Sequence, residues 1–133
     1  MVQATNEQLL AYYGATPWVA IQCHGMPAST CPNTDVFPTH GRNAAPAATD
    51  KITVLRDTHK SLQPAWDVDL PGSGSCSLNA TENMQGRLLN GVPAQNVCST
   101  EASSTTQKFV HIEQDPSFRN AADWTAAVMT TFP

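Results

Sequence analysis

Charged residues are scarce in this chain, and this scarcity limits the classes of protein it can belong to. Only 14% of the 133 residues are charged, and 7 Lys and Arg stand against 11 Asp and Glu, whereas soluble domains carry about 25% charged residues. A net charge of −4 argues against a basic nucleic-acid module and a polybasic membrane anchor. We infer that Ser, Thr, Asn and Gln supply part of the polar surface, and we expect partner subunits to cover some of the rest.

Long apolar runs are also missing. No run approaches the roughly 20 residues of a membrane span, so no membrane contact is predicted. The opening MVQATNEQ has neither the basic start nor the apolar run of a signal peptide. At 41% hydrophobic the chain is nevertheless globular, and its length suits a single domain over 1–133 with one core. We expect a protein kept in a cytoplasm, or one whose leader has been removed.

The cysteines do not follow a metal-binding pattern. The chain has four cysteines, Cys23, Cys31, Cys76 and Cys98, and none of them forms a C-x-x-C motif. No phosphate-binding glycine loop occurs either. The sequence therefore predicts neither a metal site nor another cofactor. Four cysteines allow three pairings within one chain. Pairing close in sequence gives Cys23–Cys31 and Cys76–Cys98. Bridges between subunits and free buried thiols are the alternatives.

Period-two alternation predicts an antiparallel sheet. Residues 51–57 and 64–70 are expected to form a hairpin, because Trp66, Val68 and Leu70 alternate with aspartates in its second arm. Residues 107–114 are a further strand, with Val110 and Ile112 on one face. Shorter candidates are a helix over 5–13, strands over 17–23 and near 35–38, and a short element over 84–92.

The C-terminal segment predicts a helix over 116–131 that covers the sheet. Asp115-Pro116 supplies an N-cap followed by proline at the first helical position. The apolar stripe comprises Phe118, Ala121, Ala122, Thr125, Val128, Met129 and Phe132, and the core or dimer contacts are assigned to Phe118, Trp124, Val128 and Phe132. The predicted fold class is therefore α+β, with a two-fold dimer completing the cover of the sheet.

The search for catalytic residues finds one pair. His111 and Glu113 lie two apart on a predicted strand and so share a face. They could perform acid–base chemistry on a phosphodiester with Arg42 or Arg56 as oxyanion stabiliser, or they could form an ordinary polar strand face. His24, His40 and His59 lie in loop-like sequence and are interpreted as surface residues, so the chain is not predicted to be an enzyme.

The order of KITVLRD, PAWDVDLP, a loop with Ser, Gly and Cys, QKFVHIEQ and a final helix resembles the coat proteins of single-stranded RNA bacteriophages of the levivirus type. The resemblance covers about 51–132. It implies a homodimer that self-assembles into an icosahedral shell around viral RNA, located in the virion. It further implies that the loop over 72–106 lines the symmetry axes and that Cys76 and Cys98 bridge subunits. The predicted helix over 5–13 departs from the family, which opens with a hairpin.

By position, the resemblance assigns weak RNA contacts on the inner face of the shell to seven residues: Lys51, Thr53, Ala65, Asp67, Lys108, Phe109 and His111. Asp67 and Asp69 would oppose phosphate on that face, so binding per subunit is expected to be weak and to depend on many copies. The expected partners are thus further copies of the chain and RNA. Two alternatives are a small secreted, disulfide-stabilised α+β interaction module of surface or pilin-like type, and a small hydrolase or nuclease using His111 and Glu113.

Overall fold

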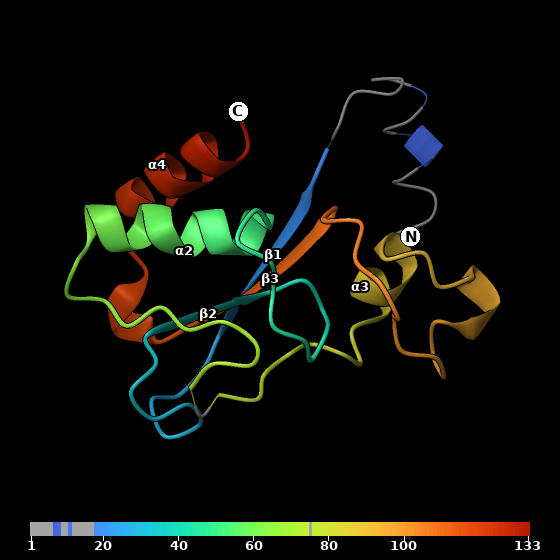
Figure 1. The fold of residues 1–133 in the computed structure, drawn as a ribbon, viewed down its shortest axis with the longest axis horizontal. Coiled ribbons are helices and arrows are strands. Elements are labelled where there is room, and N and C mark those ends of the chain that lie inside the picture. Colours follow the sequence, from blue (N-terminus) through green and yellow to red (C-terminus); the bar gives the residue numbers. More distant parts are fainter. Residues whose placement is uncertain (1–6, 9–10, 12–17, 75) are drawn as a thin grey trace.

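The computed structural model describes residues 7–8, 11, 18–74 and 76–133. The helix predicted over 5–13 lies mostly outside these residues. Three strands form one sheet: β1 (Ala20–Gly25), β2 (Val36–Thr39) and β3 (Phe109–Gln114), in the order β1-β3-β2 (Figure 1). The α+β class is confirmed, but the sheet is mixed rather than antiparallel, because β3 pairs in parallel with β1 and antiparallel with β2.

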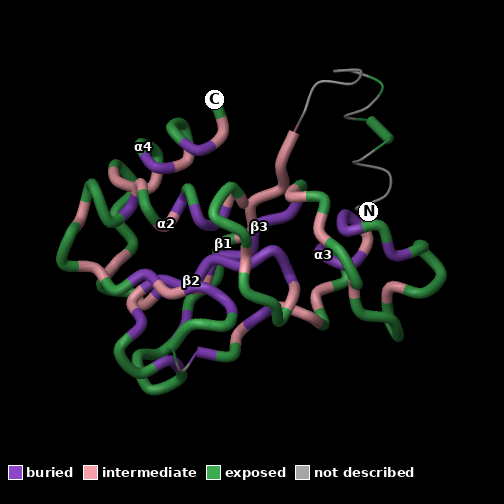
Figure 2. Tube along the Cα trace, viewed as in Figure 1, coloured by how far each residue is buried: buried purple, intermediate pink, exposed green. Residues whose placement is uncertain are grey.

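Strand β3 is the centre of the sheet and is buried along nearly its whole length (Figure 2). A central strand is covered on both faces, and alternate side chains therefore belong to two different layers. Val110 and Ile112 face one layer, while Phe109, His111 and Glu113 face the other. This division of the predicted strand over 107–114 is confirmed.

The hydrophobic core fills the first of these layers. Helices α2 (Lys51–Leu62) and α4 (Ala121–Thr131) pack against each other on this side of the sheet (Figure 1). The buried residues of the cluster are Val36, Ile52, Leu55, Val68, Leu70, Val110, Ile112 and Ala127. Burial of such side chains contributes about 1.5–3 kcal/mol each before entropy is counted, so this layer carries most of the stability.

The predicted hairpin over 51–57 and 64–70 is wrong, because its first arm is helix α2. The β-branched run at 52–54 favours a strand locally, yet Ile52, Leu55 and His59 are buried at helical spacing against the sheet and α4. The second arm is an irregular segment with one parallel β-bridge between Val36 and Val68. Its alternation survives, since Val68 and Leu70 are buried while Asp67 is exposed.

His59 lies inside the core between two indole rings. Its ring stacks on Trp66 with centroids 5.5 Å apart and meets the Trp124 ring edge-on at 4.0 Å. The side chain is fully buried, and neither ring nitrogen has a hydrogen-bond partner among the described residues. Burial lowers the pKa of His59, partly opposed by the charge of Asp123. The interpretation of His59 as a surface residue is therefore wrong.

The C-terminal helix is present but interrupted. Asp115 accepts a hydrogen bond from Ser117 N at 2.9 Å and opens a 3-10 turn, η2 (Pro116–Phe118). Asn120 then caps α4 through Ala122 N at 3.0 Å. Phe118, Trp124, Val128 and Phe132 pack on the core as predicted. The predicted stripe is wrong for four of its residues, because Ala121, Ala122, Thr125 and Met129 are exposed, whereas Ala127 and Thr131 are buried.

The second layer is smaller and contains the only disulfide among the described cysteines. Cys31 and Cys76 are bonded and pack with Met26 and Phe37. Helix α3 (Met84–Leu89) covers Phe109, and η1 (Ala94–Asn96) follows it. The expected pairs Cys23–Cys31 and Cys76–Cys98 are wrong, since Cys23 and Cys98 are free and exposed. Within the described residues, no helix is long and apolar enough to span a membrane.

Candidate functional site

The parallel pairing of β1 with β3 brings two histidines and a glutamate together. In the register, Gln22 lies opposite His111 and His24 lies opposite Glu113. Side chains at alternate positions share a face, so all four project from the sheet on the side of α3. His111 and Glu113 share one face, as predicted. A third group, His24, lies beside them, at the end of a strand rather than in a loop.

The three side chains are within reach of one ligand. His111 Nε2 and Glu113 Oε1 are 3.0 Å apart. The rings of His24 and His111 have centroids 4.5 Å apart, and one potential ligand atom from each of the three residues lies within 4.8 Å of the others. The side chains of His111 and Glu113 are only 6% and 12% exposed, whereas His24 is exposed. We call these three residues the His-His-Glu cluster.

A second set of polar groups positions His111. Gln22 Oε1 accepts a hydrogen bond from Asn83 Nδ2 at 2.6 Å and lies 3.4 Å from His111 Nδ1. Both Gln22 Oε1 and the Glu113 carboxylate are acceptors, so a neutral His111 with its single N–H can donate to only one of them, and an imidazolium can donate to both. The Nε2 atom is the one that faces Glu113, at the shorter distance of 3.0 Å. Asn83 is itself fixed, since its side chain accepts from Gly86 N and caps α3.

The surroundings of His111 shift its pKa in opposite directions. Burial lowers the pKa of His111, the hydrogen bond and charge of Glu113 raise it, and the neighbouring His24 lowers it further. The net pKa of His111 lies below its usual value. At neutral pH the imidazole is therefore mostly neutral, which leaves it able to accept a proton or to coordinate a metal ion.

An open pocket of about 250 Å³ adjoins the cluster. Its walls are Leu78, Ala80, Glu82, Asn83, His111 and Glu113. The segment carrying Glu82 is held at both ends, by the disulfide at Cys76 and by the buried Arg87, whose Nε donates to Thr81 O at 2.7 Å. The pocket therefore has a fixed wall and two carboxylates.

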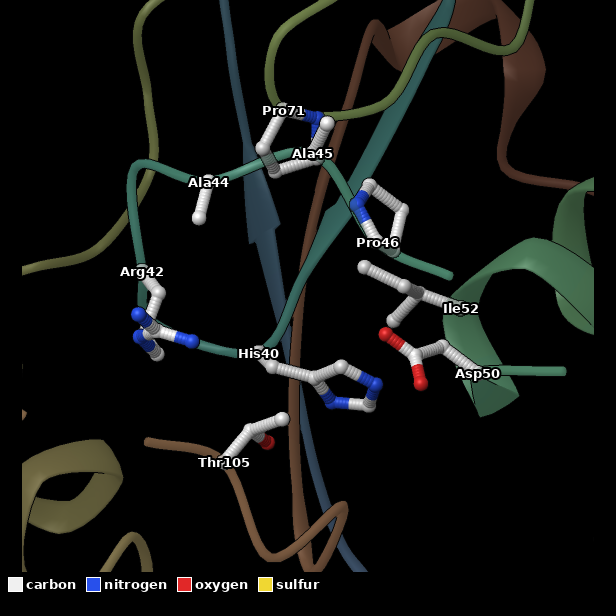
Figure 3. A pocket seen from close by; sticks show the side chains of 9 residues that line it. All are labelled: His40, Arg42, Ala44, Ala45, Pro46, Asp50, Ile52, Pro71 and Thr105. Carbon is white, nitrogen blue, oxygen red and sulfur yellow. The ribbon is translucent and has the colours of Figure 1, made fainter. Parts of the chain in front are cut away.

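The arginines predicted to stabilise an oxyanion lie elsewhere. Arg56 forms an exposed ion pair with Asp57 on α2, at 2.8 Å. Arg42 lines a separate cavity of about 30 Å³ together with His40 and Asp50 (Figure 3). Neither arginine lines the pocket at the His-His-Glu cluster, so the predicted combination of His111, Glu113 and an arginine is not brought together.

The small cavity in Figure 3 is lined by a third buried histidine, His40. His40 is 4% exposed, and its Nδ1 donates to Phe109 O at 2.7 Å, while Nε2 has no partner among the described residues. Burial lowers the pKa of His40, which the bond to Phe109 and the charge of Asp50 oppose. This hydrogen bond links the segment after β2 to the start of β3, so the His40 side chain stabilises the fold. The interpretation of His40 as a surface residue is therefore wrong.

The seven residues assigned to an RNA face do not lie on one exposed surface. Thr53, Phe109 and His111 are buried. Lys51 lies on α2, where its Nζ donates to Thr131 O at 3.0 Å. Ala65, Asp67 and Lys108 are exposed, but only Lys108 adjoins a strand of the observed sheet, β3.

Comparison of the chain with protein-family models, with curated proteins and with solved structures finds no match. Of the segments that carried the resemblance to levivirus coat proteins, QKFVHIEQ contains the expected strand, β3. KITVLRD belongs to a helix, and PAWDVDLP contributes one β-bridge in place of a strand. Assembly into a shell stays a prediction.

Sequence reasoning missed His24 as a member of the site and predicted no metal ligands. The strand predicted over 17–23 stopped one residue short of His24, whereas β1 continues to Gly25. The available signal was the alternation of Gln22 and His24 with Ile21 and Cys23, which is the same period-two pattern that identified His111 and Glu113.

Proposed function

We propose that the chain is a small hydrolase whose reaction centre is the His-His-Glu cluster. The observation that carries this proposal is the convergence of two imidazoles and a carboxylate from two parallel strands, beside an open pocket that His111 and Glu113 line. A water held among these groups would have a proton acceptor in the cluster and an adjoining space for a substrate carbonyl.

The pocket favours a neutral or cationic substrate. Glu82 and Glu113 both line it, and within the part of the chain that the structure describes no Lys or Arg does. A polyanion such as RNA would be repelled by two carboxylates, because phosphate binding depends on Lys and Arg contacts. Leu78 and Ala80 provide an apolar wall. Small esters or amides with an apolar acyl group therefore suit the pocket better than phosphodiesters.

Hydrolysis of chromogenic esters and anilides by the purified protein tests the proposal. Glu113→Gln keeps the size of the side chain but removes its charge and basicity, and should lower kcat/KM by about 100-fold or more, as expected for loss of acid–base catalysis. Glu101→Gln is the matched control, because Glu101 is exposed in the loop before β3, and it should retain full activity.

The ribonuclease alternative is tested in the same preparations with RNA as substrate. The proposed hydrolase would be overturned by either of two results. In one, Glu113→Gln still cleaves the esters or anilides; in the other, no preparation of the wild-type protein cleaves them. Cleavage of RNA in preference to the esters, lost in Glu113→Gln, would keep the catalytic centre and refute the argument about charge in the pocket.

A further inference from the structure

The His-His-Glu cluster has the donor set of a transition-metal site. Two imidazole nitrogens and one carboxylate oxygen are the ligands of many catalytic zinc sites and of the two-histidine, one-carboxylate iron sites. With metal–ligand bonds of about 2.0–2.2 Å, tetrahedral geometry places donor atoms about 3.3 Å apart. His111 Nε2 and Glu113 Oε1 are already 3.0 Å apart, and all three groups lie within 4.8 Å. His24 is exposed, so its side chain would have to move closer to the other two donors on binding an ion.

The surroundings of His111 are compatible with a ligand role. With its N–H on Nδ1, which lies 3.4 Å from Gln22 Oε1, His111 would present the Nε2 lone pair toward Glu113 Oε1, 3.0 Å away. Ligand histidines usually donate their second ring N–H to a carboxylate, a backbone carbonyl or a water. The Gln22 amide oxygen would fill that place here, and Asn83 Nδ2 holds this oxygen in turn at 2.6 Å.

The coordination sphere would have an open position. Three protein ligands leave at least one site for water on a zinc ion, and the pocket of about 250 Å³ lies against two of the three ligands. Cys23 does not join the set, because it lies between Gln22 and His24 and therefore projects from the opposite face, beside Ile112 and Trp124. Two nitrogen donors argue against calcium and magnesium, which prefer oxygen ligands.

We propose that His24, His111 and Glu113 bind one divalent transition-metal ion, zinc by preference, with Gln22 as the outer partner that orients His111. The inference deepens the proposed function, and the catalytic role of the ion rests on it. The ion would take the place of the proton between His111 and Glu113 and would bind and acidify the water that the hydrolase reaction requires.

Zinc binding to the full chain, freed of metal by a chelator, tests the proposal. The background for all variants is Cys23→Ser with Cys98→Ser, because exposed thiols could bind zinc on their own. Affinity is measured by competition with a chromophoric chelator, and Co²⁺ absorption reports the ligand geometry. We expect one zinc ion per chain in the background protein.

The variants separate ligation from folding. His24→Ala changes an exposed side chain and should leave the thermal unfolding of the metal-free protein unchanged while weakening zinc by about 100-fold or more. Gln22→Leu should weaken zinc by about 10–100-fold, as for other outer partners. Glu101→Gln should bind as the background does. Equal zinc affinity in His24→Ala and the background protein, or no binding by the background protein, would overturn the metal site.

The metal site and the hydrolase can fail separately. Specific zinc binding in a protein that hydrolyses no ester or anilide supports the metal site and overturns the hydrolase. Hydrolysis that requires Glu113 but persists unchanged in chelator-treated protein, with zinc shown to be absent, keeps the hydrolase and overturns the metal site.

Discussion

Removing the Cys31–Cys76 disulfide should destabilise the folded chain by about 4 kcal/mol. The two cysteines are 45 residues apart in the sequence, and closing a loop of that length in the unfolded chain costs about 4 kcal/mol of conformational entropy in the chain-entropy model. Cys31 and Cys76 are 1% and 8% exposed within the cluster containing Met26 and Phe37. Alanine at both positions keeps this surrounding apolar, so loss of the covalent link is the dominant change.

Urea unfolding followed by tryptophan fluorescence measures the effect, since Trp66 and Trp124 lie against the core. With a slope of about 2 kcal/mol per M urea, the midpoint of Cys31→Ala/Cys76→Ala should fall by about 2 M. A difference in unfolding free energy below about 1 kcal/mol would refute the reasoning, because the bond would then contribute little constraint.

The matched control also tests the connectivity. Cys23→Ser/Cys98→Ser replaces two exposed free thiols and should stay within about 0.5 kcal/mol of wild type. If the pairing close in sequence formed instead, this control would break both disulfides and lose stability as well. A large loss in the control would therefore contradict the arrangement of the second layer.

Three further predictions concern the core, helix α3 and assembly. Burial lowers the pKa of His59, so as the pH falls through about 6.5 the unfolded state binds this proton before the folded state does. The unfolding free energy should therefore fall from pH 7 to 5.5, with at most about 1.4 kcal/mol per pH unit from this group. His59→Leu should show a shallower fall in urea titrations, and an unchanged slope would contradict this. A Cβ on Gly86 would lie 2.6 Å from the buried Phe109 ring, so Gly86→Ala should lower the free energy of unfolding by about 1–2 kcal/mol despite the better helix propensity of alanine. The control Gln85→Ala, at an exposed position, should change it little. Equal stability of both variants would show that the Phe109 ring can move. Light scattering after size exclusion tests the coat-protein hypothesis, which requires uniform particles of tens of nanometres, and a sharp monomer near 14.3 kDa under several salt and redox conditions would exclude it.

Strand β3 was predictable because its information is local. Alternation over 110–113, with Val110 and Ile112 apolar and His111 and Glu113 polar, defines two faces without reference to the rest of the chain. The α+β class and the packing of Phe118 and Trp124 on the core followed from similarly local signals. Asp115 and Asn120 cap η2 and α4, but the break between these two elements and the exposure of part of the predicted apolar stripe were missed.

Helix α2 was mistaken for a strand because local propensity and tertiary burial disagree there. Ile52, Thr53 and Val54 favour extended structure by side-chain branching. The spacing of Ile52, Leu55 and His59 favours a helix instead, but this pattern places a histidine at a core position, which a reading of the sequence counts as polar. In the core, the His59 ring packs between the rings of Trp66 and Trp124, and Trp124 is distant in the chain, so this contact cannot be seen from the local sequence.

The His-His-Glu cluster depends on strand register, which explains why only two of its members could be foreseen. Gln22 and His111 are 89 residues apart in the sequence, and nothing local specifies that their strands pair in parallel. The register also determines the chemistry of the site. A slip of one residue would turn the opposite face of β1 toward the cluster, replacing His24 by the thiol of Cys23. Burial of Val110 and Ile112 in the core fixes the orientation of β3, and the partly buried Ile21, packed on the same core, fixes that of β1. The hydrophobic layer therefore selects histidine over cysteine at the candidate metal site, and the packing of the core and the chemistry of the pocket are two consequences of one pairing of strands.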